Sequence, residues 1–257
     1  DVMMVVAAPI AFGIIIGLLL GLVGGGGSIL TVPVLVYVLG LSPHEATATS
    51  LVIVGATAVA GVAPHMQADR VQWRTAILFG AAGILGTFGG AWANRQVSGP
   101  VILLLFGILM LVVAARMVQS GMPDAQSMSE AQVWVIPVAG LTVGLLTGFF
   151  GVGGGFVIVP ALVLWLGLPM RVAVGTSLVI IAINSLAGAV AHRDDGGFNW
   201  MVALFFIAGG LLGGQLGARA VGRVNEAVLK RSFAGVMVAI ALFLIVANAA
   251  VVWQSLA

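Results

Sequence analysis

The stretch Thr49-Ser50-Leu51-Val52-Ile53 returns unchanged as Thr176-Ser177-Leu178-Val179-Ile180 later in the 257-residue chain. The shift between the two copies is 127 residues, the difference between 176 and 49. Rarer residues repeat at the same shift: Gly24–Gly27 with Gly151–Gly154, Pro33 with Pro160, His65 with His192, and Trp73 with Trp200. Apolar sequence aligns easily by chance, but these residues seldom fall at one spacing by accident. The chain therefore consists of two homologous halves.

The composition predicts that the solvent of this protein is lipid. Hydrophobic residues make up 61% of the chain and charged residues only 7%, with a mean hydropathy of +1.22. Soluble domains carry roughly 25% charged residues, so these few charges would not cover a water-exposed surface. Apolar runs long enough for membrane helices recur from end to end. They are continuous rather than alternating, which argues against a β-barrel. We expect the lipid bilayer as a partner and the cell inner membrane as the location.

Several other partners and cofactors are not expected. The chain has no cysteine, which removes disulfides, thiolate catalysis and cysteine metal sites together. Its net charge is +2, and the basic residues are scattered between apolar segments. That pattern fits orientation in a membrane better than nucleic-acid binding. We predict no nucleic acid, no metal, no cofactor and no catalytic residue, whereas the sequence leaves open whether copies form a homo-oligomer.

The halves divide the chain into repeat one (1–118), a polar linker (119–130, Gln119 to Glu130) and repeat two (131–257), which together form one membrane domain. Each repeat holds an apolar stretch, a glycine cluster, a short apolar segment and three full-length helices. The expected segments are Val5–Val23, Ser28–Leu39, His44–Ala63, Val71–Asn94 and Gly99–Val118, then Gln132–Phe150, Gly155–Gly167, Arg171–Ala191, Asn199–Val221 and Glu226–Val251.

The first two segments of each repeat cannot form one straight helix. Val5 to Gly40 would extend roughly 54 Å as a helix, whereas the hydrocarbon core is about 30 Å thick. A glycine cluster in the middle also breaks helices. The predicted fold is therefore an all-α polytopic membrane protein with two homologous repeats, each a broken or re-entrant helix pair plus three full transmembrane helices. The sequence leaves open whether the short second segment spans or re-enters.

The positions of the basic residues predict that the repeats are inverted. Under that arrangement one side receives eight of them: Arg70, Arg74, Arg116, Arg171, Arg219, Arg223, Lys230 and Arg231. The other side receives only Arg95 and Arg193. Parallel repeats would give almost no bias, so the positive-inside rule favours inversion, with both termini outside the cytoplasm.

The glycine breaks are the predicted substrate-binding elements. Inverted repeats with broken helices are typical of transporters, whose substrates bind where the breaks meet near the midplane. Helix N-termini present free N–H groups and partial positive charge, and two facing each other would cradle an anion without Arg or Lys. The predicted residues are Gly25, Gly26, Gly27 and Ser28 in repeat one, and Gly153, Gly154 and Gly155 in repeat two. The alternative is that the glycines only permit tight helix crossing.

Hydroxyl, amide and imidazole groups complete the predicted site. Thr49, Ser50, Thr176 and Ser177 can donate to an oxyanion, although they can equally bond a carbonyl of their own or a neighbouring helix. Asn184, which replaces Thr57 in the repeat, is a further polar residue inside a predicted helix. We assign His65 and His192 as candidates for a proton relay. The alternative for both histidines is contact with the membrane surface.

Carboxylates are missing from the predicted membrane interior. They fall in loops, at chain ends or on the first turn of a helix: Asp1, Glu45, Asp69, Asp124, Glu130, Asp194, Asp195 and Glu226. Cation pumps and many proton-coupled carriers place carboxylates at mid-membrane. This distribution argues against a cation substrate and favours a small anion.

The motifs resemble those of the TauE/SafE sulfite exporter family, also called the toluene-sulfonate uptake permeases. Both halves carry them, at Gly24–Pro33, Thr49–Ile53, Gly151–Pro160 and Thr176–Ile180, so the resemblance covers nearly the whole chain. Membership implies a secondary transporter of sulfite, thiosulfate or an organosulfonate such as sulfoacetate. The resemblance does not choose among these oxyanions, and the sequence leaves the direction and the coupling ion open.

Two other functions remain as alternatives at this point. One is a cation or metal permease, which the carboxylate positions and the presence of only three histidines disfavour. The other is an intramembrane hydrolase that uses Ser50 or Ser177 with a histidine. Ser50 and His65 are fifteen residues apart on one predicted helix, roughly 22 Å, so they cannot touch.

Overall fold

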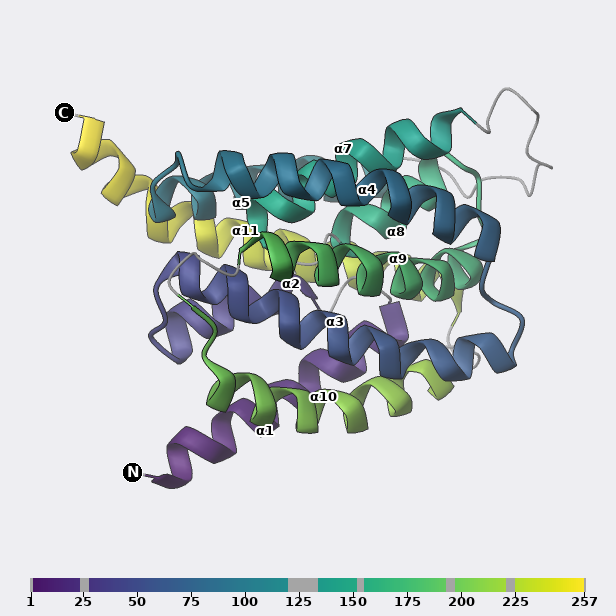
Figure 1. The fold of residues 1–257 in the computed structure, drawn as a ribbon, viewed down its shortest axis with the longest axis horizontal. Coiled ribbons are helices and arrows are strands. Elements are labelled where there is room, and N and C mark those ends of the chain that lie inside the picture. The colour runs from purple at the N-terminus through teal and green to yellow at the C-terminus, as the bar shows by residue number, and fades with distance from the viewer. Residues whose placement is uncertain are drawn as a thin grey trace.

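The fold was taken from a computed structural model, which describes residues 2–23, 28–119, 134–151, 155–192, 197–220 and 225–256. Every regular element in these ranges is a helix (Figure 1). Repeat one contains α1 (Val2–Val23), α2 (Ser28–Pro33) with a π-helical turn η2 (Val34–Val38), α3 (Pro43–Gln67), α4 (Trp73–Asn94) and α5 (Gly99–Gln119). Repeat two contains α7 (Val135–Phe150), α8 (Gly155–Leu164), α9 (Met170–Ala191), α10 (Trp200–Ala220) and α11 (Glu226–Leu256).

The length and apolar character of these helices make the chain a multi-pass membrane protein. Within the described ranges, five helices are long and apolar enough to cross a membrane: α3, α4, α5, α9 and α10. α11 is longer still, with 31 residues. The predicted linker Gln119–Glu130 lies outside the described residues except for Gln119, which ends α5.

Two predicted helix ends need correction. The helix expected to end at Ala63 continues through Pro64 to Gln67, and the last helix continues beyond Val251 to Leu256. Proline removes one helical hydrogen bond, but membrane helices tolerate it when neighbouring helices compensate. In α3 the continuation buries His65 completely and brings its ring to the Gly21 carbonyl of α1.

The short second segments end in the same way in both repeats. Gly40 (φ +72°) and Gly167 (φ +67°) have left-handed backbone conformations. Around them Leu41 N donates to Leu35 O and Leu168 N donates to Leu162 O, each at 3.0 Å. Each bond runs from residue i to residue i−6 and encloses a left-handed glycine, the residue with which helices commonly end. α8 has 10 residues, roughly 15 Å, so it covers about half of a ~30 Å core.

Repeat one differs in one detail, since its short segment changes hydrogen-bonding pattern. The segment predicted as one helix over Ser28–Leu39 is α-helical to Pro33 and π-helical over Val34–Val38. Pro33 has no N–H to continue the α-helical ladder, and a π-turn accommodates the interruption.

The helices pair across the repeats rather than within them. α1 packs along α10, and its repeat-two equivalent α7 packs along α4. These two pairs lie on opposite edges of the molecule, with α3 and α9 between them (Figure 1). α5 packs against its own equivalent, α11. Each helix contact therefore has an equivalent contact in which the two repeats have exchanged roles.

α3 and α9, which are equivalent in the two repeats, run antiparallel. Gly188 of α9 lies against Leu51, Ser185 against Gly55, and Leu178 against Gly61. One end of the molecule therefore holds the start of α3 and the end of α9, and both chain termini lie toward that end (Figure 1). Inverted repeats require opposite directions for equivalent helices, as this pair has, whereas inversion of the two repeats as wholes stays a prediction. The side of the membrane on which each end lies stays a prediction.

That membrane orientation can be tested on the two ends of α4. Arg74, on its first turn, and Gln96, just beyond its end, are both exposed. We expect Gln96→Cys to react with an impermeant maleimide in intact cells, and Arg74→Cys to react only after permeabilisation. The native chain has no cysteine and supplies the background control. Reaction of Arg74→Cys in intact cells would contradict the positive-inside assignment.

Candidate functional site

The two copies of the Thr-Ser motif lie at opposite ends of the α3–α9 pair. Both motifs are near the start of their helix, and the helices run antiparallel. Gly175, next to Thr176, lies against His65 and the Arg70 carbonyl at the far end of α3. The four hydroxyls therefore do not gather around one point. They form two half-sites, separated along α3 by about the 22 Å between Ser50 and His65.

Thr49 and Thr176 each hold the beginning of a helix from the other repeat. The Thr49 hydroxyl accepts a hydrogen bond from Asn199 N at 3.1 Å, directly before α10. The Thr176 hydroxyl accepts one from Gln72 N at 2.9 Å, directly before α4. Both threonines are fully buried. This matched pair satisfies N–H groups that a helix start leaves unpaired.

Ser50 connects its motif to the glycine break of the other repeat. Its hydroxyl donates to Thr47 O at 2.9 Å and also to Gly151 O, at the end of α7. Gly151 has a φ of +67°, and a Cβ there would collide with Thr47, so only glycine fits. Ser177 donates to Val174 O at 2.7 Å, the same i−3 bond that Ser50 makes. Both serine hydroxyls thus donate to backbone carbonyls, which was the predicted alternative to binding an oxyanion.

Side chains from three helices satisfy the last carbonyls of α7. His192 Nε2 contacts Gly148 O at 2.7 Å, Asn94 Nδ2 donates to Phe149 O at 2.6 Å, and Ser50 reaches Gly151 O. The equivalent contact in repeat one joins His65 Nε2 to Gly21 O at 3.3 Å. Each histidine therefore ties the end of the helix before a glycine break, α1 or α7, to the end of the long helix α3 or α9 of the same repeat.

Both histidines are fully buried, so their alternative role as membrane-surface contacts is wrong. The sequence suggested that role because each lies beside an interfacial loop. Packing against α1 and α7 instead draws the rings inside. The ring nitrogen that faces a carbonyl must carry the proton, which leaves Nδ1 of His65 as the free position. This atom is buried and has no hydrogen-bond partner among the described residues.

The glycine breaks themselves mostly lie outside the described residues. This applies to Gly25, Gly26, Gly27, Gly153 and Gly154, whereas Ser28 and Gly155 begin α2 and α8 and are buried. The last residues of α1 lie near His65 and the end of α7 lies near Ser50, at opposite ends of α3. The ends of α1 and α7, which precede the two breaks, are therefore separated along α3. That the breaks themselves face each other stays a prediction, because those glycines lie outside the described residues.

Asn184 lies between the two half-sites, in the middle of α9. It is fully buried, and neither Oδ1 nor Nδ2 has a hydrogen-bond partner among the described residues. The amide sits against α4, where a Cβ at Gly83 would lie 2.5 Å from Oδ1. Its equivalent, Thr57, faces Gly210 in the same way but donates to Ile53 O at 2.8 Å. Within the described part of the chain, Thr57 thus uses its one O–H donor, whereas Asn184 keeps both N–H donors unused.

Two further buried polar groups were missed from the sequence. Thr31 on α2 and Ser185 on α9 are buried, and neither hydroxyl has a partner in the described parts of the chain. Thr31 is replaced by Ile158 in repeat two, so comparison of the halves gave no signal for it. Ser185 directly follows Asn184, so the prediction of Asn184 as a site residue could have pointed to it.

The chemistry of this interior is uniform. Every polar side chain that is buried within the described ranges is a hydroxyl, an amide or an imidazole. No group of three or more His, Asp or Glu residues that could hold a metal occurs among the described residues. Neutral donors of this kind can bind an oxyanion, because each hydrogen bond to a charged ligand is stronger than one to a neutral group.

Comparison with known proteins now identifies the family. The family model described as "Sulfite exporter TauE/SafE" matches residues 9–244. The chain belongs to the TauE/SafE family. A "Probable membrane transporter protein" of Xylella fastidiosa strain Temecula1 is 36% identical over 253 residues, covering 96% of this chain and 94% of the relative. YunE of Bacillus subtilis, also named a probable membrane transporter, is 28% identical over 81% of this chain and 86% of its own length. No solved structure gives a significant match.

Proposed function

We propose that this TauE/SafE protein is a secondary transporter of small sulfur oxyanions in the cell inner membrane. The substrate class is sulfite, thiosulfate or an organosulfonate. One observation carries the proposal: a fully buried amide, Asn184, with unused hydrogen-bonding capacity midway between two symmetry-related half-sites. A buried polar group without a partner costs about 1–3 kcal/mol, so its presence favours a ligand role.

The half-sites would bind the anion on its way to and from Asn184. One consists of Thr49 and Ser50 with the repeat-two break, and the other of Thr176 and Ser177 with the repeat-one break. The proposed substrate-binding residues remain Gly25, Gly26, Gly27, Ser28, Thr49, Ser50, Gly153, Gly154, Gly155, Thr176, Ser177 and Asn184. His65 and His192 remain proposed proton relays. Alternation of access between the two ends follows naturally from inverted halves.

The two alternative functions receive less support. A hydrolase would need a serine activated by a base. The hydroxyls of Ser50 and Ser177 donate to backbone carbonyls instead. A cation permease would be expected to place carboxylates among its buried polar groups. The names of the relatives describe membrane transporters, which favours transport over catalysis.

A binding assay on the purified protein tests the proposed function. We expect sulfite, thiosulfate or sulfoacetate to give a saturable isotherm by titration calorimetry, whereas Zn²⁺ and Ca²⁺ give none. A fluorophosphonate probe should label neither Ser50 nor Ser177. Saturable Zn²⁺ binding with no response to any of the three oxyanions would overturn the proposal.

The same assay tests the hydroxyls. In the proposed complex the hydroxyl protons of Ser50 and Ser177 turn from their backbone carbonyls to the anion. Loss of one hydrogen bond to a charged ligand is worth about 1.5–3 kcal/mol, so Ser50→Ala and Ser177→Ala should each weaken binding roughly ten- to a hundredfold. Arg95→Gln is the control, because Arg95 is exposed and its Nη2 donates to Ala191 O at the end of α9. Unchanged affinity in both serine variants would remove them from the site.

A further inference from the structure

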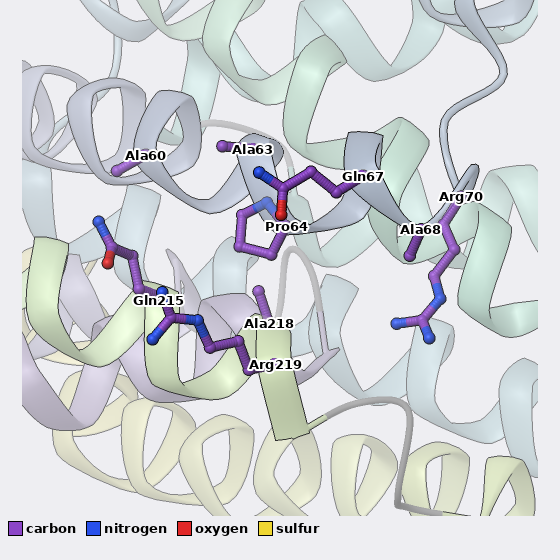
Figure 2. Close-up of a pocket in the computed structure, with 9 residues that line it drawn as sticks. All are labelled: Ala60, Ala63, Pro64, Gln67, Ala68, Arg70, Gln215, Ala218 and Arg219. Carbon is purple, nitrogen blue, oxygen red and sulfur yellow. The ribbon is translucent and has the colours of Figure 1, made fainter.

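A basic pocket lies outside the proposed transport site, between the last turns of α3 and α10. Its volume is about 410 Å³. Gln67 and Arg70 line it from the α3 side, and Gln215 and Arg219 from α10 (Figure 2). Ala60, Ala63 and Pro64 form its apolar wall. No ion pair of Arg70 or Arg219 with a carboxylate occurs in the described ranges.

The pocket opens away from the α3–α9 centre. On α3, Gly61 and His65 are buried and face α9, whereas Ala63 and Gln67 are exposed. On α10, Gln215 and Arg219 are likewise exposed. A ligand can therefore reach the pocket from the lateral surface of the protein without entering the transport site.

Polarity changes along this groove with depth. On α3, Gln67 lies four residues from Ala63 and seven from Ala60, so the two alanines share its helix face and line the pocket with it. On α10, Leu216 and Leu212 lie three and seven residues before Arg219, and both are more than half exposed. Cationic and amide groups thus stand at the helix ends, and apolar residues occupy the turns before them.

The other half of the molecule lacks this pocket chemistry. At the repeat shift, Arg219 corresponds to Trp92, Gln215 to Phe88, and Arg70 to Gly197. Trp92 and Phe88 are 66% and 47% exposed. The Thr-Ser motifs occupy matched positions in the two repeats, whereas the paired arginines and glutamines that line this pocket have no equivalents among the corresponding residues. The pocket therefore serves one face of the membrane, the face that also carries most of the basic residues.

We propose that this pocket binds the phosphate headgroup of an anionic phospholipid, with Arg70 and Arg219 as the cationic contacts. Arginine suits phosphate because its guanidinium forms paired hydrogen bonds. The apolar surface below the headgroup fits the acyl chains, which a free inorganic anion does not possess. Basic pockets between membrane helices are a general mode of lipid headgroup binding. The inference is independent of which substrate is transported.

Native mass spectrometry of the full-length protein tests the proposal. Detergent-solubilised protein is titrated with phosphatidylglycerol, with phosphatidylcholine, or with sodium phosphate and sulfite. We expect bound phosphatidylglycerol on the wild type and on Arg74→Gln, an exposed arginine that does not line the pocket. Arg219→Gln should reduce the bound fraction at least severalfold, and Arg70→Gln with Arg219→Gln should abolish the preference over phosphatidylcholine.

Three results would overturn the lipid assignment. One is equal phosphatidylglycerol binding by the double variant and the wild type. Another is an equal loss in Arg74→Gln, which would assign the effect to overall surface charge. The third is saturable phosphate or sulfite binding that needs Arg70 and Arg219 and is unaffected by lipid. Unfolding temperatures measured without added lipid check that the variants are folded, and Arg219→Gln alone suffices if the double variant is not.

Discussion

Gly86→Val is expected to prevent stable assembly of this protein. Gly86 of α4 faces α7, and a Cβ there would lie well under 3.0 Å from the Leu141 carbonyl oxygen, a distance that real Cβ atoms essentially never show. The obstacle is backbone, so no side-chain rotation can relieve it. Overpacking costs about 1–3 kcal/mol even in adaptable cores, and the larger valine should exceed that. Unfolding followed by tryptophan fluorescence, with size-exclusion profiles, measures the effect.

Gly89 on the same helix is the matched control. It is exposed, and nothing lies within 4 Å of the position of its added Cβ. Alanine is preferred over glycine in a helix by about 1 kcal/mol, so Gly89→Ala should leave stability unchanged or raise it. Gly86→Ala should lower it. Equal unfolding temperatures for these two alanine variants would contradict the close backbone contact between α4 and α7.

The symmetry of the fold extends this prediction to the other helix pair. Gly213 of α10 is the repeat equivalent of Gly86, and its Cβ would meet the Ile14 carbonyl of α1 in the same way. Gly213→Val should therefore be as damaging as Gly86→Val. In a bilayer, close packing rather than the hydrophobic effect holds helices together, which explains why small residues stand at both contacts.

Asn184→Leu should raise stability and abolish substrate binding at the same time. Leucine removes a buried amide that has no hydrogen-bond partner among the described residues, which relieves up to about 1–3 kcal/mol of desolvation cost. It also removes a donor group with two N–H bonds. If both contact the anion, affinity should fall at least about a hundredfold. Calorimetric titration and thermal unfolding of one purified sample measure the two effects.

Thr57→Val is the control for Asn184→Leu. Thr57 occupies the equivalent position in α3 but is not one of the proposed binding residues, and its hydroxyl donates to Ile53 O within its own helix. We expect its replacement to change affinity less than threefold, well below the ~1.5 kcal/mol of a lost ligand hydrogen bond. If Asn184→Leu binds the oxyanion normally, the amide has a packing role and the proposed centre of the site is wrong.

Much of the architecture could be predicted from the sequence because the repeat is detectable. The Thr-Ser motif, the glycine clusters and the paired histidines identify equivalent helices from the sequence alone. Helix ends followed from apolar runs, but Pro64 misled the prediction, since α3 gains buried contacts for His65 by continuing past it. The rule that proline ends a helix describes a local loss of one hydrogen bond, whereas the packing of His65 against α1 favours continuation of α3.

The site was harder to predict because repeats conceal how they face each other. Ser50 meets the end of α7 from the other repeat, a contact between residues 101 positions apart. Antiparallel packing of α3 and α9 then moves the two motifs to opposite ends, whereas the sequence alone suggested one shared cradle. Thr31 had no polar equivalent in repeat two, so pattern matching gave it no weight. Only the fold shows that it is buried.

Flux in proteoliposomes tests transport most directly. Purified wild-type protein and Asn184→Leu are reconstituted in parallel, and uptake of ³⁵S-labelled sulfite, thiosulfate and sulfoacetate is measured against empty vesicles. The account predicts saturable uptake of at least one of these anions by the wild type, inhibited by the unlabelled anion, and background uptake by Asn184→Leu. Background uptake of all three by the wild type, or equal uptake by the folded Asn184→Leu variant, would contradict it.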